Sequence, residues 1–200
     1  MGDRTAVQEL SRTQRRRHEV RLAGSGGQGL ILAGIILAEA AGLYDGLHVV
    51  QTQVYGPESR GGASRADVII SPDEIDYPKA TTPQALLVMS QDAYDRFART
   101  LAPGGLLLHD SSMVEHRYVL GEGRRVVGLP FTRVALEELG RAIVATIMGL
   151  GVLVAWTGVV TPGALEKAVA GRVSGGTREL NLMALRRGFD LARQAREGTL

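Results

Sequence analysis

A glycine-rich segment, Gly24-Ser-Gly-Gly-Gln-Gly29, is the first part of the sequence that could perform chemistry. Its glycines match the spacing G-x-G-x-x-G, in which backbone without side chains turns tightly and lets a ligand approach the amide groups. An apolar run follows and predicts a helix, whose first N–H groups attract an anion such as phosphate. Gln28 adds a side-chain amide for a ligand or a neighbouring subunit. The alternative is a tight turn that only packs the helix against a sheet.

Two common phosphate-binding patterns can be tested against this segment. A P-loop has Lys-Ser or Lys-Thr after its last glycine, but Leu30-Ile31 stands there. A dinucleotide site has an acidic residue at the end of the second strand. The run 48–54 ends without one, and Asp45 comes before it. A nicotinamide dehydrogenase is therefore poorly supported, and a stand-alone nucleotide-binding oxidoreductase that uses the glycine loop remains the alternative function.

A second loop, Tyr55-Gly-Pro-Glu-Ser-Arg-Gly-Gly-Ala-Ser64, also contains groups suited to binding. Arg60 places a forked cation beside Gly61-Gly62, where the backbone bends freely, and a carboxylate or phosphate would suit it. Alternatively, Arg60 pairs with Glu58 and only stiffens the loop.

Other candidates are weaker. His109-Asp110 resembles half of a charge-relay pair, but Ser111 and Ser112 follow directly and do not lie on a glycine elbow, so a hydrolase is not supported. The remaining histidines are isolated in sequence. We therefore predict no catalytic residue and no metal ligand in this chain.

The elements around the two loops alternate between strand and helix. Strands are expected at 18–23, 48–54, 66–71, 85–89, 106–109 and 126–129, and helices at 30–41 and 92–101, with Gly42 ending the first helix. Strand, glycine turn, helix and strand form a βαβ unit with parallel strands. From Thr132 onward the pattern is helical. The expected fold is α/β: a Rossmann-like parallel sheet with flanking helices and a helical C-terminal portion, whose loops bind ligands at the carboxyl ends of strands.

Composition narrows the function classes. The chain has 200 residues, 44% of them hydrophobic, and no cysteine, so it cannot by itself hold a disulfide, a cysteine-ligated cluster or a thiol nucleophile. Aromatic residues make up 4%, too few for the stacking surfaces of single-stranded nucleic-acid proteins. The uncharged stretch 142–165 is interrupted by glycines and is interpreted as a buried helix rather than a membrane span.

Charge is unevenly placed along the chain. Residues 1–21 contain six arginines and three acidic residues, whereas the whole chain carries only +2. We expect a basic N-terminal arm at 1–17 and a single α/β domain at 18–200. The arm lacks the apolar run of a signal peptide, and the protein is expected to be cytoplasmic, with no nucleic-acid or membrane partner.

The two loops together, with the run Ile-Ile-Ser-Pro-Asp-Glu-Ile-Asp-Tyr-Pro at 69–78, resemble the gamma subunit of 2-oxoacid:ferredoxin oxidoreductases, most closely the 2-oxoglutarate type rather than the pyruvate type. The resemblance covers roughly residues 18–195. One departure is Thr146, where relatives often have Asn.

The resemblance implies a division of labour within a complex. Such enzymes oxidatively decarboxylate a 2-oxoacid, join the acyl group to coenzyme A and pass two electrons to ferredoxin. Thiamine diphosphate and iron–sulfur clusters would lie on alpha and beta subunits, or on a small ferredoxin-like delta subunit, and none would be bound by this chain alone. This chain would contribute to assembly and to coenzyme A contact. The candidate cofactor-binding residues are Gly24, Ser25, Gly26, Gly27, Gln28, Gly29, Tyr55, Glu58, Arg60, Gly61 and Gly62.

Overall fold

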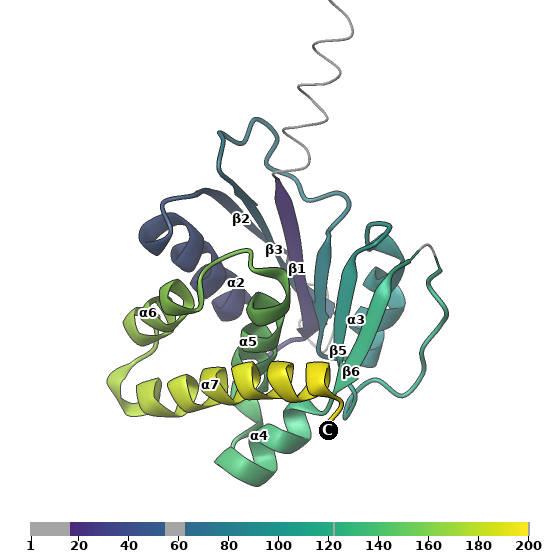
Figure 1. Ribbon diagram of the computed structural model, residues 1–200, viewed down its shortest axis with the longest axis vertical. Coiled ribbons are helices and arrows are strands. Elements are labelled where there is room, and N and C mark those ends of the chain that lie inside the picture. The colour runs from purple at the N-terminus through teal and green to yellow at the C-terminus, as the bar shows by residue number, and fades with distance from the viewer. Residues whose placement is uncertain (1–16, 55–62, 122, 200) are drawn as a thin grey trace, which may run out of the picture.

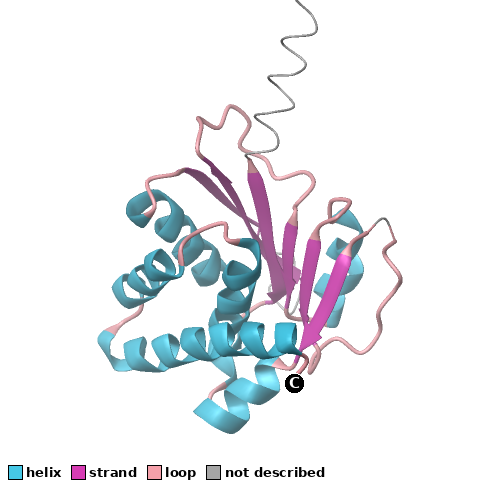
Figure 2. Cartoon of the chain, viewed as in Figure 1, coloured by secondary structure: helices cyan, strands magenta, loops and turns pink. Residues whose placement is uncertain are grey.

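Six strands form one sheet with helices on both of its faces (Figures 1 and 2). The computed structural model describes residues 17–54, 63–121 and 123–199. The strands are β1 (His18–Ser25), β2 (His48–Val54), β3 (Ala63–Ser71), β4 (Ala85–Val88), β5 (Leu106–Asp110) and β6 (Arg125–Leu129). The helices are α2 (Leu30–Glu39), α3 (Gln91–Phe97), α4 (Phe131–Leu139), α5 (Ala145–Thr157), α6 (Pro162–Arg172) and α7 (Gly175–Glu197), with short turns η1 (Ala40–Tyr44), η2 (Ala98–Thr100) and η3 (Ala142–Val144).

The sheet is mixed, in the order β2-β3-β1-β4-β5-β6. β1, β4, β5 and β6 are parallel, whereas β3 pairs antiparallel with both β1 and β2. The α/β class and the helical C-terminal part are confirmed, and the expectation of a parallel sheet holds except at β3. Only eight residues separate β2 from β3, too few for the crossover that parallel neighbours need. Because β3 is antiparallel to both of its neighbours, β2 runs in the same direction as β1.

The central strand β1 separates two cores. Successive side chains of a strand point to opposite faces. Val20 and Leu22 accordingly face one core with α2, α5, α6 and α7, whereas Ala23 faces a smaller one with α3. Both faces of the strand are covered, which fixes its position and holds the loop that follows it at the carboxyl end of the sheet.

The first helix does not end at Gly42 as the sequence predicted. The chain continues from α2 into η1, a single wider turn, and leaves it at Gly46, where φ is +68°. Gly42 is needed for packing instead, because a Cβ there would lie 3.0 Å from Cγ1 of Val49 on β2. Close helix–sheet contact, and not helix termination, explains this glycine.

The uncharged stretch forms the buried helix α5, as expected. Residues 145–154 are all buried, and α7 packs across the helix. A Cβ at Gly151 would lie 2.7 Å from the carbonyl oxygen of Leu185, and one at Gly188 would lie 2.2 Å from that of Met148. Glycine at these two positions therefore lets the two helices approach closely. Among the residues that the structure describes, no helix is long and apolar enough to cross a membrane.

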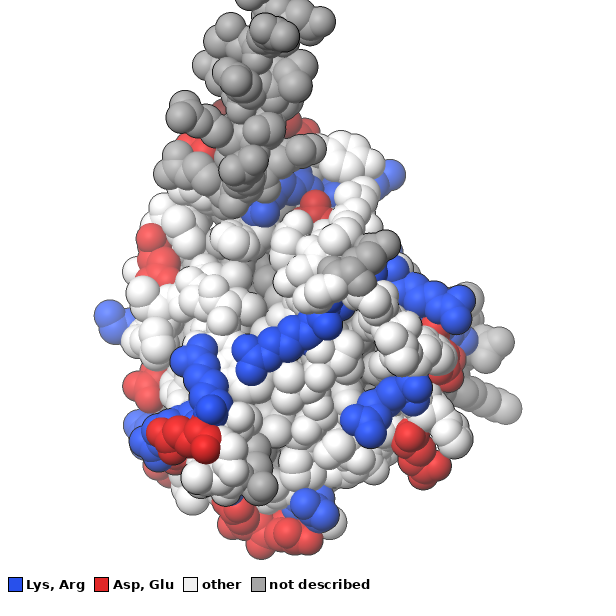
Figure 3. All heavy atoms as spheres, turned by 45° about the vertical axis from the view of Figure 1, so that its right-hand side comes forward, with Lys and Arg blue, Asp and Glu red and all other residues white. Residues whose placement is uncertain are grey.

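Charged side chains lie mainly at the surface in mixed order. On the face shown in Figure 3, Lys and Arg side chains lie beside Asp and Glu, with uncharged areas between them and no broad field of one sign. This arrangement agrees with the near-zero charge that the sequence assigns to the chain beyond its first residues.

Candidate functional site

The glycine loop, Gly24–Gly29, joins the end of β1 to the start of α2. Gly24 and Ser25 are the last residues of the strand, and Gly29 caps the helix. Gly27 and Gly29 have φ values of +85° and +78°, in the left-handed region that favours glycine. The first turn of α2 contains no acidic residue, and no side chain caps it. Its N–H groups therefore face the loop without a competing anion from their own helix.

The Gln28 side chain fixes the shape of this loop. Its Oε1 accepts a hydrogen bond from the Ser25 N–H at 2.7 Å, and its Nε2 donates to the Met89 carbonyl oxygen at 2.9 Å. It thus links the carboxyl ends of β1 and β4. Gly24 makes room for it, because a Cβ there would lie 2.4 Å from Gln28 Oε1. These two bonds use the carbonyl and part of the amide, so the structure favours positioning of the loop as the role of this side chain.

Thr146 secures the loop from the helical side. Its hydroxyl donates to the Gln28 carbonyl oxygen at 2.7 Å, across 118 residues of sequence. The side chain is 2% exposed and lies in the first turn of α5. In the sequence, Thr146 was notable only because relatives often have Asn there. A contact between residues so far apart leaves no local sequence pattern from which it could be predicted.

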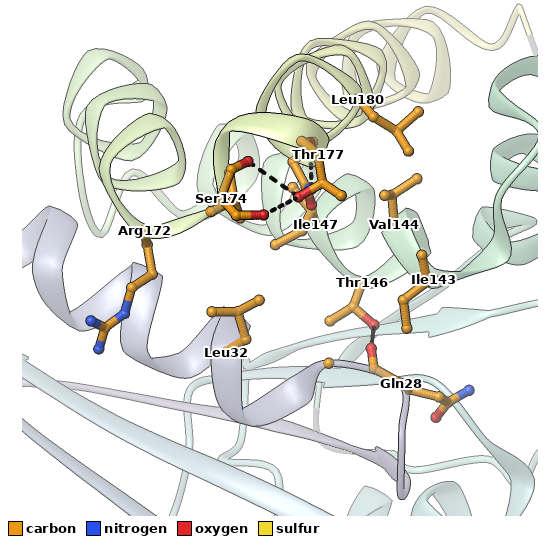
Figure 4. A pocket seen from close by; sticks show the side chains of 13 residues that line it. Gln28, Leu32, Ile143, Val144, Thr146, Ile147, Arg172, Ser174, Thr177 and Leu180 are labelled. Carbon is orange, nitrogen blue, oxygen red and sulfur yellow. Dashed lines mark hydrogen bonds between the residues drawn. The ribbon is translucent and has the colours of Figure 1, made fainter.

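Two open hollows flank the loop. The first has a volume of about 330 Å³ and lies between the start of α2 and the start of α7; Figure 4 shows Leu32 of α2, Thr146 and Ile147 of α5 and Leu180 of α7 around it. The second has a volume of about 370 Å³ and lies beyond the ends of β1 and β4. Both are lined by Gln28, Ile143 and Thr146; the second is also lined by Gly26, Gly27, Met89, Met113, Thr132, Ala142 and Ala145.

The second hollow occupies the position where open α/β sheets bind ligands. The helix after β1 packs in the larger core and the helix after β4 packs in the smaller one, on the opposite face of the sheet. Neighbouring parallel strands whose connections leave to opposite faces create a crevice at their carboxyl ends. The glycine loop forms one wall of this crevice and Met89 part of another.

The second candidate loop lies outside the described residues, and with it Tyr55, Glu58, Arg60, Gly61 and Gly62. Its described flanks do reach the glycine loop. Ala63 is the register partner of Ser25, and Val54 is that of Arg65. The Ser64 hydroxyl also donates to the Gly24 carbonyl oxygen at 3.4 Å. The strands that border 55–62 therefore end beside the glycine loop.

Few charged groups of the described residues reach the hollows. Among them, Arg172 is the only one that lines the first hollow, and its guanidinium lies 3.5 Å from the Glu39 carboxylate. No charged residue in the described part of the chain lines the second. Within the described ranges, no cluster of three His, Cys, Asp or Glu side chains is placed to hold a metal ion. An anion bound at the described part of this site would therefore be held by backbone N–H groups.

His109 and Asp110 do not form a charge relay. The Asp110 carboxylate accepts hydrogen bonds from the N–H groups of Ser112 and Thr132 and from the Thr132 hydroxyl. His109 is fully buried, and neither ring nitrogen has a hydrogen-bond partner. Burial lowers the pKa of His109, and the charge of Arg117 lowers it further. An inaccessible, neutral imidazole serves neither a hydrolase nor a metal site.

Comparison with known proteins agrees with this geometry. Residues 19–191 match the family described as pyruvate ferredoxin/flavodoxin oxidoreductase. The 2-oxoglutarate synthase subunit KorC of Methanothermobacter marburgensis is 49% identical over 179 residues, which cover 88% of this chain and 96% of that protein. The crystal structure of a keto/oxoacid ferredoxin oxidoreductase gamma subunit from Geobacter sulfurreducens is 46% identical with a TM-score of 0.81, and the match covers 90% of this chain and 98% of that one.

A longer protein contains the same fold. The 2-oxoglutarate:ferredoxin oxidoreductase from Magnetococcus marinus, solved with 2-oxoglutarate, coenzyme A and succinyl-CoA bound, matches with a TM-score of 0.80 at 22% identity. The match covers 89% of this chain but 31% of that one. In that protein, the fold is therefore one part of a larger polypeptide.

The chain belongs to the pyruvate ferredoxin/flavodoxin oxidoreductase family. Its resemblance to the gamma subunit of 2-oxoacid:ferredoxin oxidoreductases, which the sequence of the two loops indicated, is confirmed. The comparisons do not support the alternative of a stand-alone nucleotide-binding oxidoreductase.

Proposed function

We propose that this chain is the gamma subunit of a 2-oxoglutarate:ferredoxin oxidoreductase. The complex would oxidatively decarboxylate 2-oxoglutarate, transfer the succinyl group to coenzyme A and pass two electrons to ferredoxin. The observation that carries the proposal is 45–49% identity, over nearly the full length of both proteins, to 2-oxoglutarate synthase subunits KorC. Relatives named for pyruvate synthase are only 30–32% identical.

Within this complex, the chain's own residues bind and position, and they carry out no redox step. The chain contains no cysteine, so it cannot by itself ligate an iron–sulfur cluster through thiolates. The family resemblance implies that thiamine diphosphate and the clusters lie on the alpha and beta subunits, or on a ferredoxin-like delta subunit. Those groups supply the carbanion and electron-transfer chemistry when bound. The protein would work in the cytoplasm, without nucleic-acid or membrane partners.

The site suits contact with coenzyme A, whose phosphates are anionic. The glycine loop exposes backbone without Cβ atoms at the start of α2, and the first turn of the helix contains no carboxylate that would repel phosphate. Arg60, in the neighbouring loop, would add a forked cation for the same ligand. Gln28 and Thr146 hold the loop in shape before any ligand arrives.

Reconstitution tests the proposed function directly. We expect this chain alone to show no 2-oxoglutarate oxidation, and we expect activity when it is co-expressed with the alpha and beta subunits, and the delta subunit where the enzyme has one. Reduction of ferredoxin coupled to succinyl-CoA formation is the measurement. The same subunits without this chain are the control. Full activity without this chain, or failure of the chain to join the complex, would contradict the proposal.

A further inference from the structure

The carboxylate of Asp110 joins two segments that are well separated in the sequence. Asp110 is the last residue of β5 and is fully buried. Its Oδ1 accepts a hydrogen bond from the Ser112 N–H at 2.9 Å, in the turn that follows the strand. Its Oδ2 accepts the Thr132 N–H at 2.9 Å and also the Thr132 hydroxyl, at the start of α4. One side chain therefore holds the turn after β5 against the helix that follows β6.

The start of α4 depends on this support because the helix lacks a cap of its own. Pro130, at the N-cap position, has no side-chain acceptor, and the first turn of the helix contains no acidic residue. The Thr132 N–H is bound by Asp110, and the Arg133 N–H donates to the Ser112 hydroxyl at 3.3 Å. These are the two donors that an N-cap side chain normally satisfies. The β5 turn therefore supplies the cap of α4.

The two segments that Asp110 joins form one wall of the second hollow. Met113 lies in the turn after β5, Thr132 lies in the first turn of α4, and both line the hollow. The Met113 N–H also donates to the Asp110 carbonyl oxygen at 3.1 Å. The glycine loop forms the other wall, which Gln28 and Thr146 hold in shape. Each wall thus has its own anchor, and Asp110 is the anchor of the wall that Met113 and Thr132 form.

The charge of Asp110 also distinguishes the two helices that begin beside this hollow. At the start of α4, a buried carboxylate already accepts an N–H group of the first turn. At the start of α2, no side chain caps the helix and the first turn contains no acidic residue. An anion is stabilised at a helix N-terminus by free N–H groups and by the helix dipole. The start of α2 therefore suits the phosphate of a ligand better than the start of α4.

We propose that Asp110 is a positioning residue for coenzyme A, which holds the wall of Met113 and Thr132 at a fixed distance from the glycine loop. Asp110 does not touch the ligand, because it is fully buried and does not line the hollow. It acts through Thr132, to which it is directly bonded. This inference rests on the proposed function and extends the coenzyme A site from the glycine loop to the ends of β5 and β6.

Steady-state kinetics of the assembled enzyme test the proposal. Asp110→Asn removes the charge and turns an amide NH₂ toward one of the N–H groups that the carboxylate binds, so the wall loses at least one hydrogen bond. We expect the KM for coenzyme A to rise about tenfold, a smaller effect than the roughly hundredfold that a misplacement of about 1 Å can cause. The kcat for ferredoxin reduction and the KM for 2-oxoglutarate should stay unchanged, because only binding of coenzyme A is weakened.

Two substitutions of Thr132 test the same contact more mildly. Thr132→Val removes the hydroxyl that donates to Asp110, whereas Thr132→Ser retains it. We expect the valine variant to raise the KM for coenzyme A about fivefold, which corresponds to the roughly 1 kcal/mol of one hydrogen bond, and the serine variant to match the wild type. The N–H of residue 132 still binds Asp110 in both variants, so this pair decides the question even where Asp110→Asn folds poorly.

Asp67→Asn is the matched control. It also neutralises a buried carboxylate, but one that binds Arg21 and lines neither hollow. It should lower the melting temperature of the isolated chain and leave the KM for coenzyme A unchanged. An unchanged KM with Asp110→Asn and Thr132→Val, or an equal rise with Asp67→Asn, would overturn the role of Asp110. If the wild-type complex shows no coenzyme A-dependent oxidation of 2-oxoglutarate, the proposed function itself fails, and this inference with it.

Discussion

The two ends of β1 differ in the polar groups that they contain and in how those groups are bound. Toward its amino end, the strand buries two charged side chains, Glu19 and Arg21, which are 7% and 3% exposed. At its carboxyl end, it finishes with Gly24 and Ser25, which have little or no side chain, beside open hollows. The buried charges of β1 therefore lie at the end of the strand that is distant from the candidate site.

At the amino end, every buried charge has partners within the chain. Arg21 binds both carboxylate oxygens of Asp67 on β3, at 2.7 and 3.0 Å. The Glu19 carboxylate accepts the N–H groups of Thr81 and Thr82 at 2.7 and 2.9 Å. These contacts hold the connection between β3 and β4 against the sheet. The charges are therefore structural, and nothing is left for a ligand.

At the carboxyl end, the polar groups that matter belong to the backbone. The side chain of Gln28 and the hydroxyl of Thr146 bind main-chain atoms and leave the amides at the start of α2 directed at the loop. In this molecule, buried charges stabilise the amino end of β1, whereas the candidate site at its carboxyl end presents backbone with few side chains.

Asp67→Ala should have the largest effect on stability. It leaves the Arg21 guanidinium buried without its carboxylate, which typically costs about 3–5 kcal/mol of unfolding free energy. Denaturant unfolding of the isolated chain measures it. Asp92→Ala, which breaks an exposed pair with Arg96, is the control and should cost less than about 1 kcal/mol. A similar cost for both variants would mean that the amino end of β1 is not specially dependent on its charges.

Gln28→Leu should have a smaller effect on stability but a specific effect on function. Loss of two hydrogen bonds and an unpaired Ser25 N–H should cost about 2 kcal/mol. We also expect a raised KM for coenzyme A in the assembled enzyme, since the loop loses its fixed shape.

Gln91→Leu is the matched control for Gln28→Leu. Gln91 likewise uses its side chain to bind backbone, that of Glu115 and His116, but it does so on the α3 face. This variant should lower stability and leave the KM for coenzyme A unchanged. If both variants raise the KM for coenzyme A equally, the specific role of Gln28 at the glycine loop is contradicted.

The smallest expected effect is a dependence of stability on pH caused by His109. Burial lowers the pKa of this histidine in the folded chain, below its ordinary value of 6.5. The unfolded chain therefore binds a proton first, so the contribution is fully present above about pH 6.5 and is lost as pH falls below it. The loss is at most about 1.4 kcal/mol for each pH unit.

His109→Leu should flatten this acid dependence in unfolding experiments between pH 7 and 5. The ring lies against Gly128, where a Cβ would come within 2.4 Å of its Cε1, and leucine has a similar volume but no titratable group. His48→Leu, which removes an exposed imidazole, is the comparison variant. An equal flattening by His48→Leu would show that the acid dependence does not come from the buried ring.

Much of the fold could be predicted because the sequence carries its periodicity locally. The bounds of β2 match the expected 48–54, and the buried helix expected in the uncharged stretch is observed as α5. The short connection after β2 also indicates that β3 pairs antiparallel with it. The apparent βαβ pattern favoured a parallel sheet instead. The prediction that the first helix ends at Gly42 was wrong because a glycine required for packing cannot be distinguished in sequence from one that ends a helix.

Only part of the candidate site could be predicted from the sequence. The glycine spacing showed where the backbone is exposed, but the residues that shape it do not adjoin it in sequence. Met89 and Thr146 reach Gln28 across 61 and 118 residues, and such contacts depend on the register of the strands and the packing of α5. Single-sequence reasoning has no access to either.

The close contact between α5 and α7 has a mechanical consequence. Gly151 and Gly188 let the two backbones approach closely, so a side chain at either position would push the helices apart. Thr146, at the start of α5, is bonded to the glycine loop. The glycine loop, α5 and the 23-residue helix α7 are thus connected through a continuous series of contacts. A substitution that forces α5 and α7 apart would therefore also strain the Thr146 contact that anchors the glycine loop.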